Sequence, residues 1–208
     1  MFTKDLPGQR GPADHAMRDK IVTAANELFS ERGFAATSVA EVAAKLDVAP
    51  TYLYKFFQSK TAIGQAVCDR VLSSIDEAIW RVAHGPLSPP EKLKQLFSTL
   101  LKESVGMFFA ERQLHDLVAL SLESGWPTIA AHQREIRAVL EHILDEGIAS
   151  GAFDSELDRE ETVEALFWAL HPFAHPRVLE QTIEGDLDKR SKSVGRFCVR
   201  ALEPRTFR

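Results

Sequence analysis

Residues 37–60, TSVAEVAAKLDVAPTYLYKFFQSK, place the strongest constraint on what this chain can form. Ser38 followed by Glu41 has the spacing of a capping box, in which two side chains satisfy free backbone amides at the start of a helix. Apolar residues then recur at intervals of three and four, which predicts one buried helical face. Pro50 ends this helix, because proline disfavours helical backbone at the preceding residue, and it is well suited to begin a second helix.

The second helix is predicted over residues 50–57, with Leu53 and Phe57 turned inward. Two short helices joined by a turn of about three residues form the helix-turn-helix pattern, whose second helix reads the major groove of DNA. A preceding helix over residues 14–32 carries an apolar stripe and ends at Gly33. The pattern therefore predicts a small three-helix bundle of the DNA-binding type.

The landmarks of this region resemble the tetracycline-repressor (TetR) family of transcriptional regulators over residues 18–66. They are Ala24-Ala25, Leu28-Phe29, Gly33-Phe34, Thr37-Ser38, Val42-Ala43, Val48, Leu53-Tyr54, Phe57 and Ser59-Lys60. Three positions depart from the family pattern: Asp47 replaces a turn glycine, Ala49 replaces a serine, and Thr51 stands where glycine is common. The resemblance implies a DNA-binding head joined to a divergent ligand-binding body.

The rest of the chain is predicted to be helical, because no segment of strand length alternates apolar and polar residues. Helices are expected at about 60–84, 89–110, 114–124, 127–150, 158–172 and 188–202, with the start of the fifth left open to residue 162 and a further short helix left open at 177–182. This predicts an all-α fold of about nine helices. Residues 1–60 form the predicted helix-turn-helix DNA-binding domain, with 1–12 as a mobile arm, and residues 61–208 form the ligand-binding and dimerisation domain.

Composition excludes several classes of protein. The chain has 208 residues, 45% of them hydrophobic and 26% charged, which is ordinary for a globular protein. It has no apolar run of membrane-spanning length and no apolar secretory core at its N-terminus, so a cytoplasmic protein without a membrane partner is expected. Two distant cysteines suggest neither a disulfide framework nor a zinc site. The net charge of −5 is uneven, since residues 1–60 carry +1 and residues 61–208 carry −6.

Candidate DNA contacts lie on and around the second helix of the motif. Thr51, Tyr52 and Lys55 are expected to face base edges, because lysine can donate to guanine and the threonine methyl can pack against that of thymine. By resemblance, phosphate contacts are expected from Thr37 or Ser38, from Tyr54 and from Lys60. Pro50, on the outer side of the second helix, is a further candidate for contact with DNA. Packing is the alternative role for Tyr54, and helix capping is required of Ser38 in either case.

Candidate ligand contacts lie on several helices of the body, because ligand pockets are mostly apolar with a few polar groups. They are Phe97, Phe108, Phe109, Trp126, Phe167, Trp168 and His171. For each of them, packing in an ordinary hydrophobic core is the alternative to lining a ligand pocket. His171 and His175 have the spacing of two metal ligands on a helix, but Pro172 interrupts it and predicts a helix break. Neither a metal site nor a cofactor is expected.

The resemblance implies a repressor that binds a palindromic operator as a homodimer and is released by a small hydrophobic effector. The helices at 160–173 and 188–202 are expected to pair with a second copy, and effector binding is expected to tilt the helix at 60–84. One alternative is a helical enzyme or carrier with a vestigial head, for which the seven histidines are the only support. A second is a regulator without a ligand, which a filled core would favour. No enzyme motif is present, and activation remains an alternative to repression.

Overall fold

The protein is all-helical over residues 12–204, which are the residues that the computed structural model describes. This part of the chain forms ten helices and no strand. The predicted arm over residues 1–12 lies outside the described residues, apart from Pro12, where the first helix begins. None of the helices in the described part is long and apolar enough to cross a membrane.

Three helices form the head. They are α1 (Pro12–Arg32), α2 (Val39–Lys45) and α3 (Pro50–Leu53). The capping box at α2 is present as predicted: the Ser38 hydroxyl accepts from the Glu41 amide at 3.2 Å, and the Glu41 carboxylate accepts from the Ser38 amide at 2.7 Å. Buried apolar residues from all three helices, among them Phe29, Val42 and Leu53, form the centre of the bundle.

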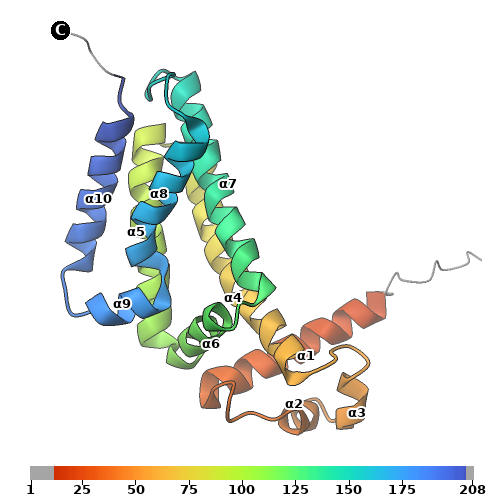
Figure 1. Cartoon of the computed structure of the whole chain (residues 1–208). Helices are drawn as coiled ribbons and strands as arrows, with labels where there is room; N and C mark the ends of the chain where they lie inside the picture. Colours follow the sequence, from red (N-terminus) through yellow and green to blue (C-terminus); the bar gives the residue numbers. More distant parts are fainter. Residues whose placement is uncertain (1–11, 205–208) are drawn as a thin grey trace, which may run out of the picture.

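α4 (Lys60–Ala83) begins at the head and extends into the body, as Figure 1 shows. Its N-terminus is capped by the Ser59 hydroxyl, which accepts from the Ala62 amide. The body then continues with α5 (Pro89–Ala110), α6 (Arg112–Glu123), α7 (Pro127–Ala149), α8 (Arg159–Ala174), α9 (Pro176–Thr182) and α10 (Leu187–Leu202). The one helix beyond the expected nine is the short α9, whose presence the sequence had left open.

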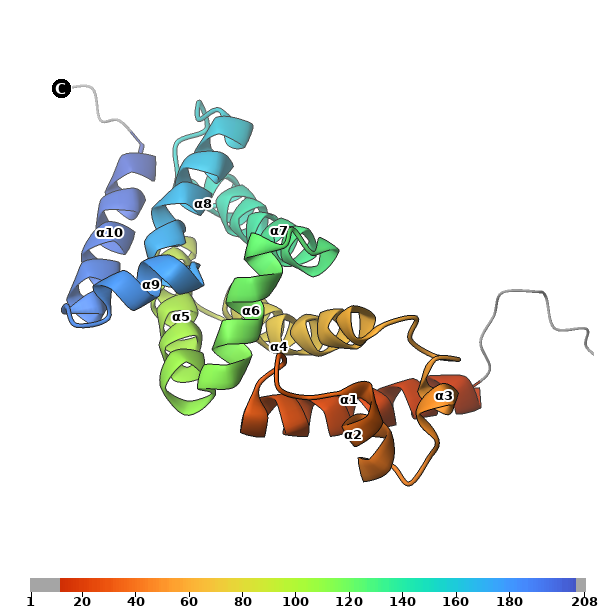
Figure 2. The ribbon, with the colours of Figure 1, turned by 60° about the horizontal axis from the view of Figure 1, so that its bottom comes forward.

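The body is a bundle in which α5 packs against α4, α8 and α10, and α7 packs against α4 and α8. α10 lies at the outer edge, and α6 lies between the body and α1 (Figures 1 and 2). α6 and the turn after it therefore form a second connection to the head. In this turn Trp126 lies edge-on to Phe34, with the ring centroids 5.9 Å apart, and packs against Gly64 of α4.

The predicted helix break at Pro172 is wrong, because α8 continues through it to Ala174. Proline has no amide to donate to the carbonyl of Trp168, and a buried carbonyl left in this way would be costly. Trp168 and Pro172 both lie on the exposed face of α8, where water can take the place of the amide. The helix ends instead before Pro176, which begins α9.

Candidate DNA-binding head and ligand cavity

α3 is held by the apolar residues on its inner side. Ala49 is extended, and Pro50 takes the first helical position, as predicted. The regular helix ends at Leu53, earlier than the predicted residue 57, but the amides of Phe56 and Phe57 still bond to the carbonyl of Leu53 at 2.9 and 3.0 Å. All three of these side chains are buried. The opposite side of α3 is consequently fixed toward the surface of the head.

Four predicted DNA contacts, Pro50, Thr51, Tyr54 and Lys55, are exposed on and directly after α3. Tyr52 is half-buried, with its ring edge-on to that of Phe56 at 5.3 Å between centroids. The Lys55 ammonium lies 5.2 Å from the centroid of the Tyr52 ring, so the two side chains share one face. DNA contact by these five residues stays a prediction.

The phosphate contact predicted for the Thr37 side chain does not fit the structure. Thr37 is only 1% exposed, and its hydroxyl donates to the carbonyl of Gly33 at 2.9 Å. This bond secures the turn after α1, where Gly33 adopts a positive φ of 85°. Ser38 is exposed, but it is engaged in the capping box of α2. Lys60 donates to the carbonyl of Ala35 at 3.0 Å, so it also ties this turn to α4.

The body contains a cavity of about 70 Å³ between α4, α5, α6, α7, α8 and α9. Most of its lining is aliphatic, including Leu72 and Ile75 of α4, Leu100 of α5 and Ile136 of α7. Ligand pockets usually measure about 300–1,000 Å³, so the cavity is small in this conformation. A drug-sized ligand would have to move the surrounding helices apart.

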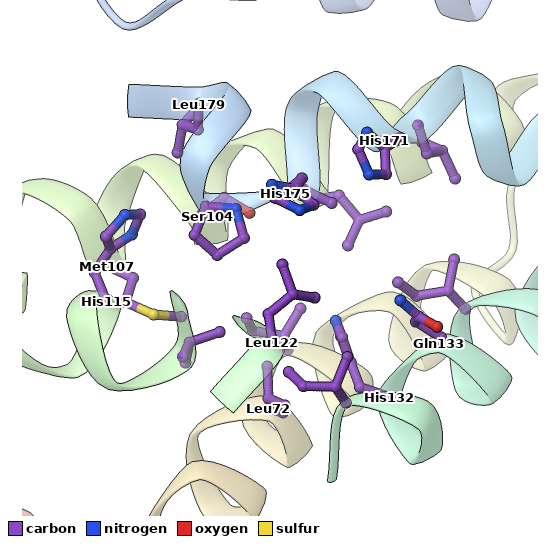
Figure 3. Close-up of a pocket in the computed structure, with 18 of the residues that line it drawn as sticks. Leu72, Ser104, Met107, His115, Leu122, His132, Gln133, His171, His175 and Leu179 are labelled. Carbon is purple, nitrogen blue, oxygen red and sulfur yellow. The ribbon is translucent and has the colours of Figure 1, made fainter. Parts of the chain in front are cut away.

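The polar groups of the cavity are chiefly histidines. The polar lining residues are Ser104, His115, His132, Gln133, His171 and His175, several of which are labelled in Figure 3. No Asp, Glu, Lys or Arg in the described part lines the cavity. The only groups there that can change charge near neutral pH are therefore the four imidazoles.

Two of the histidines are oriented by neighbours outside the cavity. His132 of α7 lies with Nδ1 2.6 Å from a carboxylate oxygen of Asp76 on α4. His175 accepts from the amide of Val178 at its own Nδ1, at 3.4 Å, and so caps α9. Each of these contacts leaves Nε2 of the same ring free. The Asp76–His132 pair also links the cavity wall directly to α4.

Burial favours the neutral form of three of these histidines. Burial is the largest of the influences that lower the pKa of His115, His171 and His175 below that of a free imidazole. The charges of His171 and Arg177 lower the pKa of His175 further. At His115 the nearby Glu180 carboxylate, 3.3 Å from Nε2, opposes the effect of burial without reversing it.

Two of the seven predicted ligand contacts, Phe167 and His171, line this cavity. The structure places the other five elsewhere: Phe97 in the core beside Phe173 and Gly195, Phe108 against His115, Trp126 at the joint with the head, and Phe109 and Trp168 at the surface. Phe109 is 69% exposed and Trp168 is 61% exposed. The helical spacing of the apolar residues predicted which face of each helix is buried, but it did not predict which residues of other helices each side chain contacts.

The sequence reasoning missed the pairing of Asp76 with His132. Asp76 follows Ile75 directly on α4, at the edge of its buried face. A carboxylate at such a position is the signal that could have indicated a buried polar partner, because a buried charge needs one. The half-buried side chain of Gln133 was missed as well, and polar residues of this kind are common on solvated helices.

Comparison with known proteins identifies both parts of the chain. Residues 21–67 match the model of the bacterial regulatory proteins of the tetR family, and residues 89–195 match the model of the tetracyclin repressor-like C-terminal domain. The chain belongs to the TetR family. Its N-terminal segment is the DNA-binding helix-turn-helix of these transcriptional regulators, as the spacing of the landmarks indicated.

TetR-family relatives agree with this assignment. The chain is 28% identical over 156 residues, 74% of each chain, to the HTH-type transcriptional repressor KstR2 of Mycolicibacterium smegmatis. Among solved structures, a transcriptional regulator from Cytophaga hutchinsonii has a TM-score of 0.69 at 18% identity, covering 90% of this chain and 99% of the other. FadR from Bacillus subtilis, solved in complex with stearoyl-CoA, has a TM-score of 0.64 at 21% identity, covering 89% and 99%. At these identities the solved structures show a shared fold.

Proposed function

We propose that the protein is a ligand-responsive transcriptional repressor, which binds a palindromic operator as a homodimer and is released by a small, largely apolar effector. The division of labour is that of the two predicted domains, with DNA bound by residues 1–60 and ligand and partner bound by residues 61–208. The observation that carries the proposal is that one helix, α4, begins at the DNA-binding head and lines a cavity of the body with Leu72 and Ile75.

The exposed side of α3 supports operator reading by Thr51, Tyr52 and Lys55. A lysine and a tyrosine on one face supply donors for base edges and phosphates. Lys60 and Ser38, at the N-terminus of α2, lie on either side of α3 in the sequence. They are the proposed phosphate contacts. For Thr37, whose side chain is buried, we propose a supporting role in the turn instead.

The surface of α8 and α10 supports a homodimer. Trp168 of α8 is 61% exposed and Phe197 of α10 is 72% exposed. Large exposed aromatic residues are unfavourable in water and are enriched at protein interfaces. Two copies joined through these helices would carry two heads, and half-sites about 34–36 Å apart would require that spacing between them.

The small volume of the cavity supports coupling between ligand and DNA. Because Leu72 and Ile75 of α4 line it, a ligand too large for this small cavity has to displace α4 or the other helices around it. A tilt of α4 changes the position of the head, since its first residue, Lys60, is bonded to the turn after α1. Coupling of this type is typically worth about 1–3 kcal/mol, or about 5- to 150-fold in affinity.

The relatives support repression and an apolar effector. KstR2 of Mycolicibacterium smegmatis is a repressor, and the FadR structure holds an acyl-CoA. A filled core would favour the alternative of a regulator without a ligand, whereas this body contains a cavity. The alternative of an enzyme has no catalytic motif in its support.

The operator is the first thing to measure. Selection of bound duplexes from random DNA by the purified protein, at two salt concentrations, is expected to enrich a palindrome with half-sites one helical turn apart. Affinity for it should fall steeply with salt, because phosphate contacts release counterions. Retention of DNA without any enriched sequence would contradict the proposal.

Variants of Tyr52 on α3 and of Lys55 directly after it then test the reading face, which is the surface formed by Thr51, Tyr52 and Lys55. Lys55→Ala and Tyr52→Ala are each expected to weaken operator binding by about 1–3 kcal/mol for each lost base contact. Lys45→Ala is the matched control, because Lys45 lies on α2 and pairs with Glu27 at 2.8 Å. If both proteins are folded and Lys55→Ala binds the operator as tightly as the control does, Lys55 does not contact the bases.

A further inference from the structure

We propose that the polar end of the cavity recognises a carboxylate, and that binding of this anion transfers one proton from solvent to the imidazole of His171. This inference rests on the proposed ligand-responsive function and adds the chemical class of the ligand. It concerns the space between α7 and α8, into which His132, Gln133, His171 and His175 project in Figure 3.

The charges around the cavity favour an anion over a cation. The described residues that line it include four histidines and no carboxylate. Asp76 and Glu180 lie behind His132 and His115, where each already has a partner. A cationic ligand would therefore meet no counter-charge at the cavity surface, whereas an anion would meet imidazoles that can become cations.

Hydrogen-bond capacity at this end is available for the anion. The Nδ1 of His175 is occupied as an acceptor from Val178, so in the neutral ring Nε2 carries the proton and can donate. The side-chain amide of Gln133 makes no hydrogen bond within residues 12–204, and its nitrogen can donate as well. These two donors come from α8 and α7, on opposite sides of the space.

His171 is the residue positioned to take the proton. Within the described part of the chain neither of its ring nitrogens has a hydrogen-bond partner, so protonation breaks no existing contact. Protonating His175 at Nδ1 would break the cap of α9, and His132 already holds Asp76 with its Nδ1. The His171 ring also lies 5.4 Å from that of Trp168, centroid to centroid, where an imidazolium is favoured by the aromatic face.

The pH dependence follows from the surroundings of His171. The other titratable groups that line the cavity with His171 are His132, His175 and His115. The charged groups behind this lining are Asp76 beside His132, Arg177 near His175, Glu180 beside His115, and the Arg137–Glu164 pair, whose guanidinium packs on the ring of Phe167. Burial lowers the pKa of His171 in the free protein, and a carboxylate beside the ring would raise it again.

Binding is therefore expected to take up a proton at pH 7. Carboxylate affinity should fall about tenfold for each pH unit between the pKa of free His171 and its pKa in the complex. A neutral ligand of the same shape would show no such dependence.

Calorimetry on the full-length protein without DNA tests this. The probes are octanoate and benzoate, compared with octanamide, 1-octanol and octylamine, each titrated at pH 6.5 and 7.5 in two buffers of different ionisation enthalpy. The expected result is that a carboxylate binds more tightly than its neutral counterparts and takes up close to one proton. His171→Gln should keep a donor and abolish the uptake, and His171→Leu should also weaken binding about tenfold or more.

His142→Leu is the matched control, because this exposed histidine lies on α7 beside Trp80 and His84, away from the cavity. Tighter binding of the amide or alcohol, an unchanged proton uptake in His171→Gln, or no binding of either carboxylate at millimolar concentration would each overturn the inference. Operator binding is measured separately, so a failure of the repressor proposal would appear there while the carboxylate result stands by itself.

Discussion

At the scale of single residues, Asp47 shows how a departure from the family pattern is accommodated. Asp47 has a φ of 54°, and it is the one non-glycine residue with a positive φ in the described part of the chain. A left-handed conformation costs an L-residue about 1–2 kcal/mol, less for aspartate, whose short polar side chain tolerates it. The turn of the motif is therefore formed with an aspartate in the left-handed conformation, at a small cost in stability.

Replacing Asp47 tests this cost. Asp47→Gly is expected to raise the free energy of unfolding by up to about 1 kcal/mol, because glycine adopts this conformation without steric strain. Asp47→Val should lower it by about 1–2 kcal/mol, since β-branching makes the left-handed region worse. Urea denaturation measures both, with Asp69→Gly and Asp69→Val, in the interior of α4, as references for which valine should be the better tolerated of the two. A more stable valine than glycine variant at position 47 would contradict the strain.

At the scale of elements, α5 and α7 are joined by an unusual ion pair. The side chain of Lys92 is only 5% exposed, and its ammonium lies 2.6 Å from the carboxylate of Glu146, which is 41% exposed. The lysine is thus desolvated and depends on its partner, whereas the glutamate can be solvated without it. Removing the two partners should therefore have unequal effects.

Glu146→Gln is expected to lower the free energy of unfolding by about 1–3 kcal/mol, because it leaves a buried ammonium without a counter-charge. Lys92→Met should change it by less than about 1 kcal/mol, since methionine keeps much of the volume and Glu146 gains water. Denaturation by urea compares the two variants. A larger loss in Lys92→Met than in Glu146→Gln would show that the pair itself is strongly stabilising.

At the scale of the whole molecule, head and body share one continuous core. Buried residues from Ile21 of α1 to Leu202 of α10 belong to a single cluster. The connection between the two parts runs through α4 and also through Trp126, which reaches Phe34 and Gly64. A displacement around the cavity can consequently reach the head by two routes.

Calorimetry is expected to show one unfolding transition for the natural protein, because a shared core unfolds cooperatively. Trp126→Ala should separate the head, which then unfolds at a lower temperature than the body. Trp80→Ala is the control, since Trp80 lies farther along α4 and donates to Glu135 at 2.9 Å without touching the head. If the two variants gave a single transition shifted by the same amount, the role of Trp126 as a joint would be refuted.

The parts of the fold that depend on local chemistry were predictable. The capping box at Ser38, the break at Pro50 and the cap at Gly33 act on backbone groups a few residues away, so their effects can be read from neighbouring letters. The helices of the body also followed from their apolar spacing. Pro172 was misjudged because a proline in a helix is tolerated on a solvated face, and which face is solvated depends on the packing of α8.

The sequence by itself determined that this chain forms helices, where most of them begin and end, and that α2 and α3 make a helix-turn-helix, because caps, prolines and apolar periodicity act locally. Only the tertiary structure decided which polar side chains meet inside the body. Asp76 and His132 are 56 residues apart in the chain, and the cavity that His132 lines arises from the way in which six helices pack. That arrangement depends on the fit of many side chains at once, which no local pattern records.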